Sequence, residues 1–418
     1  MKIGFFTDYY LPVINGVSIS VDQFRKALEK QGHTVYVFCP KYPHTPKQES
    51  PHIIRFNSTP GLWYDNYRDT FPWTTKNVNF IKSLKLDIIH LHTGAQIGIL
   101  GLRISKEEGI PNIQTYHTDV VGYSKIYKLL PIASAALLLI GKMNIKNTLS
   151  FREIFKVFKP SQDKKTVYSQ KIVQEVATIL FSLNDLIIAP SARVKKMIKS
   201  YGVTQPIEII PTGLDLDEIK HAQAIPSQLT KQLQGSRPHL LYVGRLGAEK
   251  NCQLIIRSLA QLTDRYHDIR LIIVGSGPYE HELKRLAEEL NVARHLIFTG
   301  WLEHSSVLNI YKYADIFVFP STTDTQGLVV NEAFASKLPV VFCDDQISEL
   351  LQDGKTGLKA KSTASDLAAK IADLLDHPAK AQDFAQTGFK LTRALNIDEQ
   401  AKKLAHIYQS VSKQGRKP

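Results

Sequence analysis

Two carboxylates eight positions apart mark the stretch of this chain that is best suited to chemistry. Asp324 and Glu332 lie on either side of a glycine turn in the run Ser-Thr-Thr-Asp-Thr-Gln-Gly-Leu-Val-Val-Asn-Glu, which starts at Ser321. Ionised carboxylates only accept hydrogen bonds, so such a pair can hold neighbouring hydroxyl groups of a hydroxyl-rich ligand. A loop aspartate and an ordinary surface glutamate are the alternative interpretation.

The surrounding residues indicate a strand, a loop and a helix. The apolar run 316–319 predicts a buried strand, and residues 328–335 predict a helix that begins near Gly327. Asp324 then lies in the loop and Glu332 about two turns along the helix. Unpaired N–H groups at such a helix start are suited to a phosphate. The stretch therefore predicts a site for an anionic ligand that carries hydroxyl groups.

A second loop carries two cations. Arg245 and Lys250 lie five positions apart in Gly-Arg-Leu-Gly-Ala-Glu-Lys, which follows a predicted strand at 239–243. Two cations directed at one place after a strand are what a diphosphate requires. Solvated surface cations are the alternative, but the position after a strand favours the diphosphate.

The first half of the chain offers two more candidates, each after a predicted strand. Gly16 connects the strand at 2–7 to the next helix, where ordinary turn chemistry is the alternative. His117 follows the strand at 112–116, and the carboxyl end of a strand is a better place for binding than a core.

Metal-ligand patterns are weak. His90 and His92 share one predicted strand, and we expect them to point to opposite faces and to be structural. Cys39, Cys252 and Cys343 are far apart in apolar surroundings, as is typical of reduced core cysteines. We therefore expect no metal cofactor.

Strands and amphipathic segments alternate along the chain, which predicts βαβ units and parallel sheets. We expect an α/β fold of two doubly wound, Rossmann-like domains that face a cleft. The expected divisions are a domain over 1–213, a linker over 214–236, a domain over 237–396 and a final helix over 397–418. The predicted strands are 2–7, 34–39, 87–91, 112–116, 186–189, 239–243, 270–274, 295–298, 316–319 and 340–342.

The stretch from Asp324 to Glu332 resembles the Glu-x7-Glu signature of family GT4, retaining glycosyltransferases with the GT-B fold, and the likeness extends over nearly the whole chain. The resemblance implies that Asp324 holds hydroxyls of the donor sugar and Glu332 holds the ribose. It implies that the backbone of Gln326, Gly327 and Leu328 holds phosphate or sugar oxygens. Aspartate stands where the family usually has glutamate, which shortens the reach by one methylene group.

The resemblance extends to the other loops. Arg245 and Lys250 match an element of the family that binds the donor diphosphate, and Gly16 matches the loop that closes over the phosphate from the opposite side. His117 falls where the family has a histidine that touches the transferred sugar. The implied catalytic residues are His117, Arg245, Lys250 and Asp324.

The resemblance also implies a mechanism. The family is thought to retain the anomeric configuration through same-face attack, with the departing phosphate accepting the acceptor's proton. We find no convincing carboxylate nucleophile in the sequence. A retaining, metal-independent transfer is therefore expected, to which the protein contributes positioning and electrostatics.

The net charge of +13 is concentrated in the first half of the 418-residue chain. Residues 1–213 carry 27 Lys and Arg against 15 Asp and Glu, whereas residues 214–418 carry 25 against 24. An anionic partner or a solvated basic face would explain this excess. No nucleic-acid-binding motif accompanies the charge, so we expect no nucleic acid partner.

A membrane surface is the anionic partner that the sequence favours. Between Lys142 and Lys171 it has eight Lys or Arg and two acids, and apolar residues between 151 and 158 share one helical face. The apolar run 129–141 lies just upstream and is too short to span a bilayer. These features predict an interfacial helix, with a core helix as the alternative. The expected membrane residues are Arg152, Phe155, Lys156, Phe158 and Lys159.

The sequence thus predicts a hexosyltransferase on the inner, cytoplasmic face of the cell membrane. We expect it to transfer glucose from the nucleotide sugar UDP-glucose to a lipid acceptor such as 1,2-diacylglycerol. The sequence Asp-Thr-Gln-Gly-Leu, which starts at Asp324, resembles the corresponding motif of bacterial diacylglycerol glucosyltransferases. The alternatives are mannosyl transfer to phosphatidylinositol, transfer to a soluble glycan, a nucleotide-sugar epimerase and a non-catalytic membrane-binding module.

Overall fold

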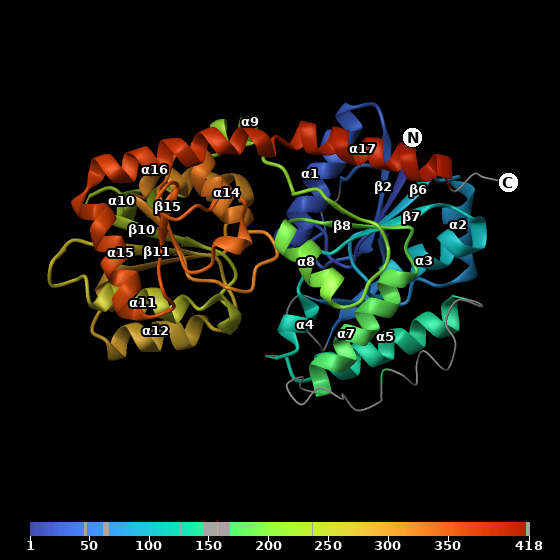
Figure 1. Cartoon of the computed structure of the whole chain (residues 1–418), viewed down its shortest axis with the longest axis horizontal. Coiled ribbons are helices and arrows are strands. Elements are labelled where there is room, and N and C mark those ends of the chain that lie inside the picture. Colours follow the sequence, from blue (N-terminus) through green and yellow to red (C-terminus); the bar gives the residue numbers. More distant parts are fainter. Residues whose placement is uncertain are drawn as a thin grey trace. The chain divides into compact units, whose positions relative to one another are not determined.

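The computed structural model of the chain describes residues 1–45, 48–61, 67–125, 127–145, 157, 168–235 and 237–414. The chain forms two compact units, one of Met1–Gly213 with Ile397–Pro418 and the other of Leu214–Asn396. Each unit is built on its own parallel sheet (Figure 1). The predicted α/β architecture of two doubly wound sheets is confirmed.

The sheet of the first unit, as far as the structure describes it, has seven parallel strands in the order β3-β2-β1-β6-β7-β8-β9. Its strands are β1 (Lys2–Phe6), β2 (Thr34–Pro40), β3 (Ile53–Phe56), β6 (Ile88–Leu91), β7 (Asn112–Thr115), β8 (Leu186–Ala189) and β9 (Ile207–Ile209). Strands β6, β7 and β8 are buried at every residue. Burial on both faces explains why β8 is a continuous apolar run rather than an alternating one.

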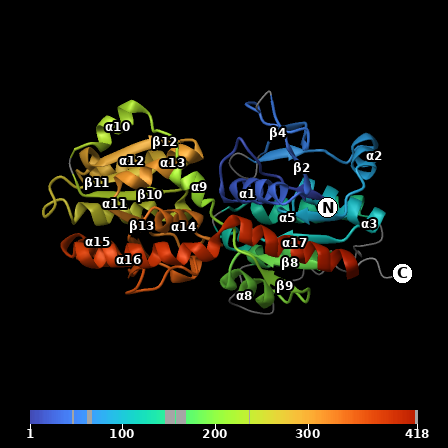
Figure 2. The same ribbon diagram turned by 90° about the horizontal axis from the view of Figure 1, so that it is seen from above.

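Helices cover both faces of this sheet, and a short antiparallel pair, β4 (Ser58–Pro60) and β5 (Arg68–Thr70), stands apart from it. The helices are α1 (Gly16–Lys30), α2 (Thr75–Ser83), α3 (Gln96–Glu108), α4 (Val120–Tyr123), α5 (Leu130–Asn144), α7 (Tyr168–Ser182), α8 (Ala192–Ser200) and α17 (Ile397–Gln414). The C-terminal helix α17 lies against α1 (Figure 2). Its buried residues Ala401, Leu404 and Tyr408 recur every three or four positions and join the core.

The sheet of the second unit has six parallel strands, within the described residues, in the order β12-β11-β10-β13-β14-β15. They are β10 (His239–Val243), β11 (Arg270–Val274), β12 (Leu296–Gly300), β13 (Ile316–Phe319), β14 (Val340–Phe342) and β15 (Gly357–Lys359). Their helices are α9 (Leu216–Lys220), α10 (Ser227–Leu233), α11 (Cys252–Ala260), α12 (Glu280–Glu289), α13 (His304–Ile310), α14 (Leu328–Ala335), α15 (Ala364–Asp376) and α16 (Pro378–Leu391).

The predicted linker, 214–236, contains two helices, α9 and α10. Its described residues, 214–235, belong to the second unit. Ile219, Leu229 and Leu233 are buried in the core of that unit, since both helices are amphipathic. Their shortness and their polar neighbours hid this role in the sequence. No helix in the described ranges is both long and apolar enough to cross a membrane.

Both sheets reverse their strand order at one point, between β1 and β6 in the first unit and between β10 and β13 in the second. Loops that leave the carboxyl ends of two such strands diverge to opposite faces of the sheet and create a crevice for ligands. The loop after β10 carries the predicted cations, the loop after β13 carries Asp324 and leads to α14 with Glu332, and the loop after β1 leads to Gly16. The topology therefore places the candidate residues where open α/β sheets bind ligands.

Candidate active site

The backbone of the cation loop after β10 is held by a neighbouring glycine loop. Gly244 donates its N–H to the carbonyl of Val274 at 3.0 Å. Gly275, which follows β11, has a φ of +124°, and a Cβ there would lie 2.2 Å from the carbonyl oxygen of Gly244. Glycine alone tolerates this φ together with so close an approach, so the β11 loop fixes the backbone that leads to Arg245.

Arg245 is oriented by a buried acid. Its Nη2 donates to Oε1 of Glu249 at 2.8 Å, and the side chain of Glu249 is 1% exposed. Within the described part of the chain, the other oxygen, Oε2, has no hydrogen-bond partner. Gly247 makes room for this carboxylate, because a Cβ on it would lie 2.3 Å from Oε2. Glu249 thus holds the guanidinium in place, and the sequence analysis did not identify it.

Lys250 and Asp324 are in direct contact. Nζ of Lys250 donates to Oδ1 of Asp324 at 2.6 Å, and the hydroxyl of Ser321 donates to Oδ2. The two loops meet because β10 and β13 are neighbours in the sheet. The cation predicted to bind a diphosphate and the acid predicted to bind a sugar therefore form one ion pair.

The start of α14 differs from the expectation of unpaired donors. The N–H of Gly327 donates to the carbonyl of Ile347 at 2.7 Å, and the N–H of Leu328 donates to the carbonyl of Gln326 at 3.0 Å. The prediction that these two groups are unpaired is wrong, because the loop after β14 and the turn itself already use them. An anionic oxygen bound there has to compete with these bonds.

Glu332 is held on both of its oxygens. The residue is 6% exposed. Nε2 of His304 lies 3.0 Å from Oε1, and the hydroxyl of Tyr311 donates to Oε2 at 2.9 Å. The other ring nitrogen of His304, Nδ1, lies 3.1 Å from Oε1 of Glu218 in α9. Four residues from α9, α13, α14 and the 3₁₀ turn Tyr311–Tyr313 thus form one hydrogen-bonded chain.

The two carboxylates change the ionisation of His304. Burial by itself lowers its pKa, but the hydrogen bonds and charges of Glu218 and Glu332 outweigh burial and raise the pKa to about 10. The imidazole is therefore a cation at neutral pH. Sequence analysis missed both His304 and Glu218, although His304 lies shortly after β12, at the same end of the sheet as the other loops.

In the first unit, Gly16 is the exposed first residue of α1. Asn15 and Ser18 form a capping box, in which each side-chain oxygen accepts the backbone N–H of the other residue at 2.9 Å. The N–H groups of Gly16 and Val17 come before any intrahelical partner, as in every helix. This is the arrangement that a phosphate-binding helix start requires.

His117 lies two residues beyond β7, at the carboxyl end of the sheet. Its Nε2 is 3.0 Å from Nδ1 of His92, which follows β6. Burial lowers the pKa of His117 to about 4, so the ring is neutral at physiological pH. A neutral imidazole suits hydrogen bonding to a sugar hydroxyl better than it suits binding to a phosphate.

The prediction that His90 and His92 point to opposite faces is wrong. Their ring centroids are 4.0 Å apart. Residues two positions apart on a strand share a face, and the sequence argument misapplied this alternation. His90 is structural as expected, since its two nitrogens meet the hydroxyls of Tyr408 and Thr115 at 2.7 Å each. His92 instead lies within hydrogen-bond distance of His117 and helps to hold its ring in place.

The structure thus brings Lys250 and Asp324 together in the second unit, where Arg245 lies on the same loop as Lys250, and places Gly16 and His117 in the first. No group of three or more His, Cys, Asp or Glu side chains in the described residues could hold a metal ion. The predicted membrane residues, Arg152, Phe155, Lys156, Phe158 and Lys159, lie outside the described residues.

Comparison with known proteins identifies the chain as a glycosyltransferase. Residues 14–218 match the family model Glycosyltransferase Family 4, and residues 228–391 match Glycosyl transferases group 1. The chain is 32% identical over 346 residues to an alpha-monoglucosyldiacylglycerol synthase of Streptococcus pneumoniae, covering 82% of this chain and 70% of the relative. It is 28% identical over 364 residues to the synthase of the same name from Acholeplasma laidlawii, covering 86% and 84%.

A GDP-mannose-dependent phosphatidylinositol monomannoside mannosyltransferase of Mycolicibacterium smegmatis also matches, at 31% identity over 203 residues, 46% of this chain and 53% of the relative. Among solved structures, Anabaena HepE in complex with UDP and glucose aligns over 98% of this chain and 100% of its own, with a TM-score of 0.73 and 17% identity. The fold is therefore GT-B. The chain belongs to glycosyltransferase family 4.

Proposed function

We propose that this glycosyltransferase transfers glucose from UDP-glucose to a diacylglycerol-type lipid, with retention at the anomeric carbon and without a metal ion. The observation that carries the proposal is the meeting of Lys250 and Asp324 at the strand-order reversal of the second sheet. The names of the two diacylglycerol synthases, which align over most of this chain, support the choice of sugar and lipid.

The residues of the second unit suit the departure of a nucleoside diphosphate. The bond between the anomeric carbon and the phosphate oxygen breaks, and the diphosphate gains negative charge as it leaves. Lys250 and Arg245 lie on the loop after β10 and stabilise that charge. Their carboxylate partners, Asp324 and Glu249, keep the two cations oriented beforehand, so little reorganisation is needed during the reaction.

The acceptor hydroxyl attacks on the face from which the diphosphate leaves, and its proton passes to the departing phosphate oxygen. The acids then serve to hold hydroxyls. Asp324 uses one lone pair of Oδ1 for Lys250 and one of Oδ2 for Ser321, and about two remain for the sugar. Glu332 likewise keeps about two lone pairs for the ribose. His117 contributes a neutral imidazole for a hydroxyl of the transferred sugar.

A titration of thermal stability tests the donor. UDP and UDP-glucose are expected to raise the unfolding midpoint by several degrees at 100-fold excess over Kd, since binding stabilises by about 2.7 kcal/mol there. GDP and GDP-mannose should give a much smaller shift. A larger shift with GDP-mannose would favour the mannosyltransferase alternative. Formation of glucosyl lipid from radiolabelled UDP-glucose separates a transferase from an epimerase or a non-catalytic module.

An exposed apolar face on α5 supports a lipid acceptor. Ile132, Leu139 and Met143 are 60%, 48% and 82% exposed. Together with exposed Ala136 they are spaced by four, three and four positions, so they share one side of the helix. Contiguous exposed apolar side chains of this kind mark interaction sites, and the apolar boundary of a bilayer suits such a face.

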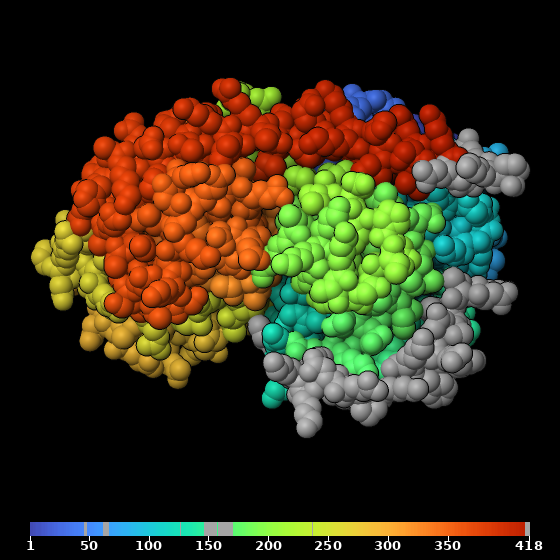
Figure 3. All heavy atoms as spheres, viewed as in Figure 1, coloured from blue at the N-terminus to red at the C-terminus, as the bar shows by residue number. Residues whose placement is uncertain are grey.

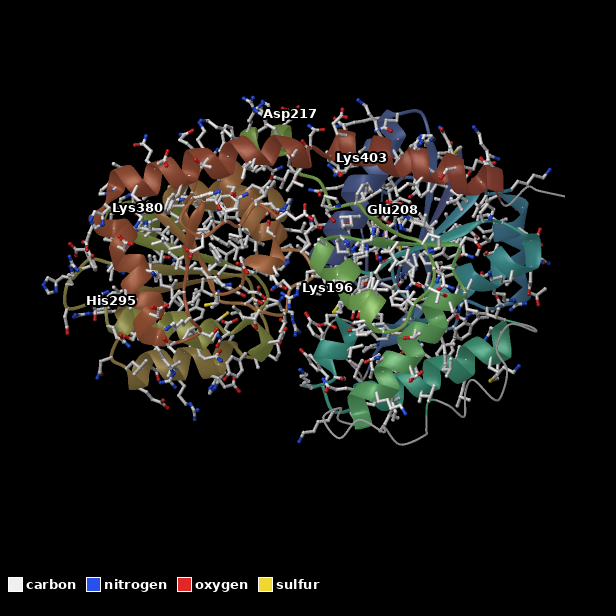
Figure 4. All side chains as sticks on the ribbon, viewed as in Figure 1. Lys196, Glu208, Asp217, His295, Lys380 and Lys403 are labelled. Carbon is white, nitrogen blue, oxygen red and sulfur yellow. The ribbon has the colours of Figure 1, made fainter. Side chains whose placement is uncertain are left out.

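Cations on α8 add an attraction for anionic headgroups. The helix carries four basic residues and no acid. It reaches the surface of the first unit in the space-filling view (Figure 3). Lys196, which Figure 4 labels, and Lys199 are exposed. Each such cation near an anionic leaflet contributes about 1 kcal/mol, which supports a peripheral location on the inner face of the membrane.

The double variant Leu139→Glu, Met143→Glu is expected to sediment with phosphatidylglycerol vesicles at least about tenfold less than the wild type, because burying one such side chain contributes about 1.5–3 kcal/mol. UDP binding should be unchanged. Phe80→Glu is the matched control, because Phe80 is an exposed apolar residue of α2 and lies outside the apolar face of α5. It should sediment like the wild type. The variant Arg152→Glu, Lys156→Glu, Lys159→Glu tests the predicted basic helix in the same assay. Wild-type sedimentation of the double variant would contradict the membrane role of α5.

A further inference from the structure

We propose that His304, clamped between Glu218 and Glu332, is a positioning residue that fixes the orientation of Glu332 for the donor's hydroxyl groups. The inference rests on the proposed function, in which Glu332 holds the ribose. It assigns a role to a histidine and to a helix, α9, that the established family membership leaves without one.

The contacts of His304 leave it little freedom. It is the first residue of α13, and its two nitrogens lie 3.1 Å from Oε1 of Glu218 and 3.0 Å from Oε1 of Glu332. Its side chain is 17% exposed, against 8% for the side chain of Glu332. A ring fixed at both nitrogens cannot rotate without breaking a hydrogen bond. The rotamer of Glu332 is therefore set from α9, through the imidazole.

The chemistry of the partners fixes the charge of the ring. An ionised carboxylate only accepts hydrogen bonds, so each nitrogen that faces one has to be a donor. A neutral imidazole has a single N–H and would direct a lone pair at one of the two carboxylates. The geometry thus requires the imidazolium form. A cation between Glu218 and Glu332 in turn attracts both carboxylates and holds Glu332 in its orientation.

The other groups that face the clamp are consistent with this charge. The described titratable groups in hydrogen-bond contact with His304 or Glu332 are Glu218 from α9 and Tyr311 from the 3₁₀ turn after α13. Burial and the charge of Glu332 raise the pKa of Tyr311, so its hydroxyl stays neutral and donates. His304 is thus the cation of the cluster. It leaves about one lone pair on each oxygen of Glu332 for a diol.

A positioning role has a measurable signature in UDP affinity. His304→Gln is expected to weaken UDP binding at pH 7.5 at least tenfold, measured by titration calorimetry, and to raise KM for UDP-glucose more than it lowers kcat. The ratio of wild-type to variant affinity should shrink toward one as the pH rises from 8 through about 10, where His304 loses its proton. The ratio cancels any pH dependence that is common to both proteins and to UDP itself.

Two further variants make the test decisive. His267→Gln replaces an exposed histidine of the same unit and should bind UDP like the wild type. Glu218→Gln removes the far end of the clamp, whose side chain is 34% exposed, and should show a smaller loss at pH 7.5. This loss should grow as the pH rises toward 9, because without Glu218 the pKa of His304 is lower and His304 loses its proton earlier than in the wild type. If His304→Gln does not fold, Glu218→Gln still tests the positioning role of His304.

The outcomes separate this inference from the proposed function. If Glu332→Gln weakens UDP binding but His304→Gln and Glu218→Gln do not, the positioning role of His304 is refuted. The proposed donor role of Glu332 then remains supported. If Glu332→Gln binds UDP like the wild type, the donor role of Glu332 fails and the clamp fails with it. A loss in His304→Gln that is the same at pH 7.5 and pH 10 indicates a structural role and also overturns the inference.

Discussion

Replacing Glu332 with alanine is expected to abolish glycosyl transfer and to weaken UDP binding by about a hundredfold or more. Two hydrogen bonds from ribose hydroxyls to an ionised carboxylate disappear, and each contributes about 1.5–3 kcal/mol. Every 1.4 kcal/mol corresponds to a factor of ten in affinity. Transfer assays with UDP-glucose and calorimetry with UDP measure the two losses separately.

Alanine at this position also leaves His304 and Tyr311 without their partner, so stability has to be measured alongside affinity. Breaking a buried charged pair costs about 3–5 kcal/mol. Glu332→Gln keeps an acceptor for His304, and its amide N–H can donate to the hydroxyl of Tyr311. It therefore removes the charge and one acceptor while keeping the shape, which separates ligand binding from folding. Glu349→Ala, at an exposed acid of the same unit, should behave like the wild type. Full activity of the folded Glu332→Ala variant would remove Glu332 from the donor site.

The strands were the most predictable part of the fold. β8, β10, β11, β13 and β14 begin and end at the predicted residues. Strands buried on both faces appear in a sequence as short continuous apolar runs, and their ends are visible where the run stops. The edge strands β9 and β15 each contain an exposed polar residue, Glu208 and Lys359, so neither appears in the sequence as a continuous apolar run.

The site residues that come directly after a strand could be predicted from the sequence. Arg245, Lys250 and Asp324 each follow a buried strand, and parallel strands bring their carboxyl ends to one edge. The clamp on Glu332 was not predictable in this way. Glu218 and His304 are 86 positions apart, and their contact depends on how α9 packs against α13. Nothing in the local sequence of either residue reports that packing.

The unpaired donors expected at Gly327 and Leu328 show a related limit. The start of a helix after a strand can be predicted, but whether its N–H groups remain unpaired depends on distant carbonyls. Here the carbonyl of Ile347, in the loop after β14, occupies the N–H of Gly327 at 2.7 Å. Under the proposed function, we therefore expect donor binding at this helix start to rely more on side chains, Lys250 above all, than the sequence suggested.

Lys250→Ala is expected to lower kcat by about 100-fold to 1,000-fold, the range found when one donor to a developing negative charge is removed. The change also leaves the carboxylate of Asp324 without its cation, and this charge then opposes the diphosphate. Lys250→Arg keeps the charge and should retain more activity than Lys250→Ala. Lys284→Ala is the matched control, because Lys284 pairs with Glu280 on the exposed surface of α12.

Chelation distinguishes this lysine from a metal ion in the same role. If the side chains of Lys250 and Arg245 stabilise the leaving diphosphate, EDTA should leave the wild-type rate unchanged, and added Mn²⁺ should not restore Lys250→Ala. Asp324→Asn sharpens the comparison, since it removes the acid and leaves the cation in place. It should impair use of UDP-glucose more than binding of UDP, because Asp324 is proposed to hold the sugar. Complete loss of wild-type activity with EDTA and its recovery with Mn²⁺ would instead show that a metal ion stabilises the leaving diphosphate.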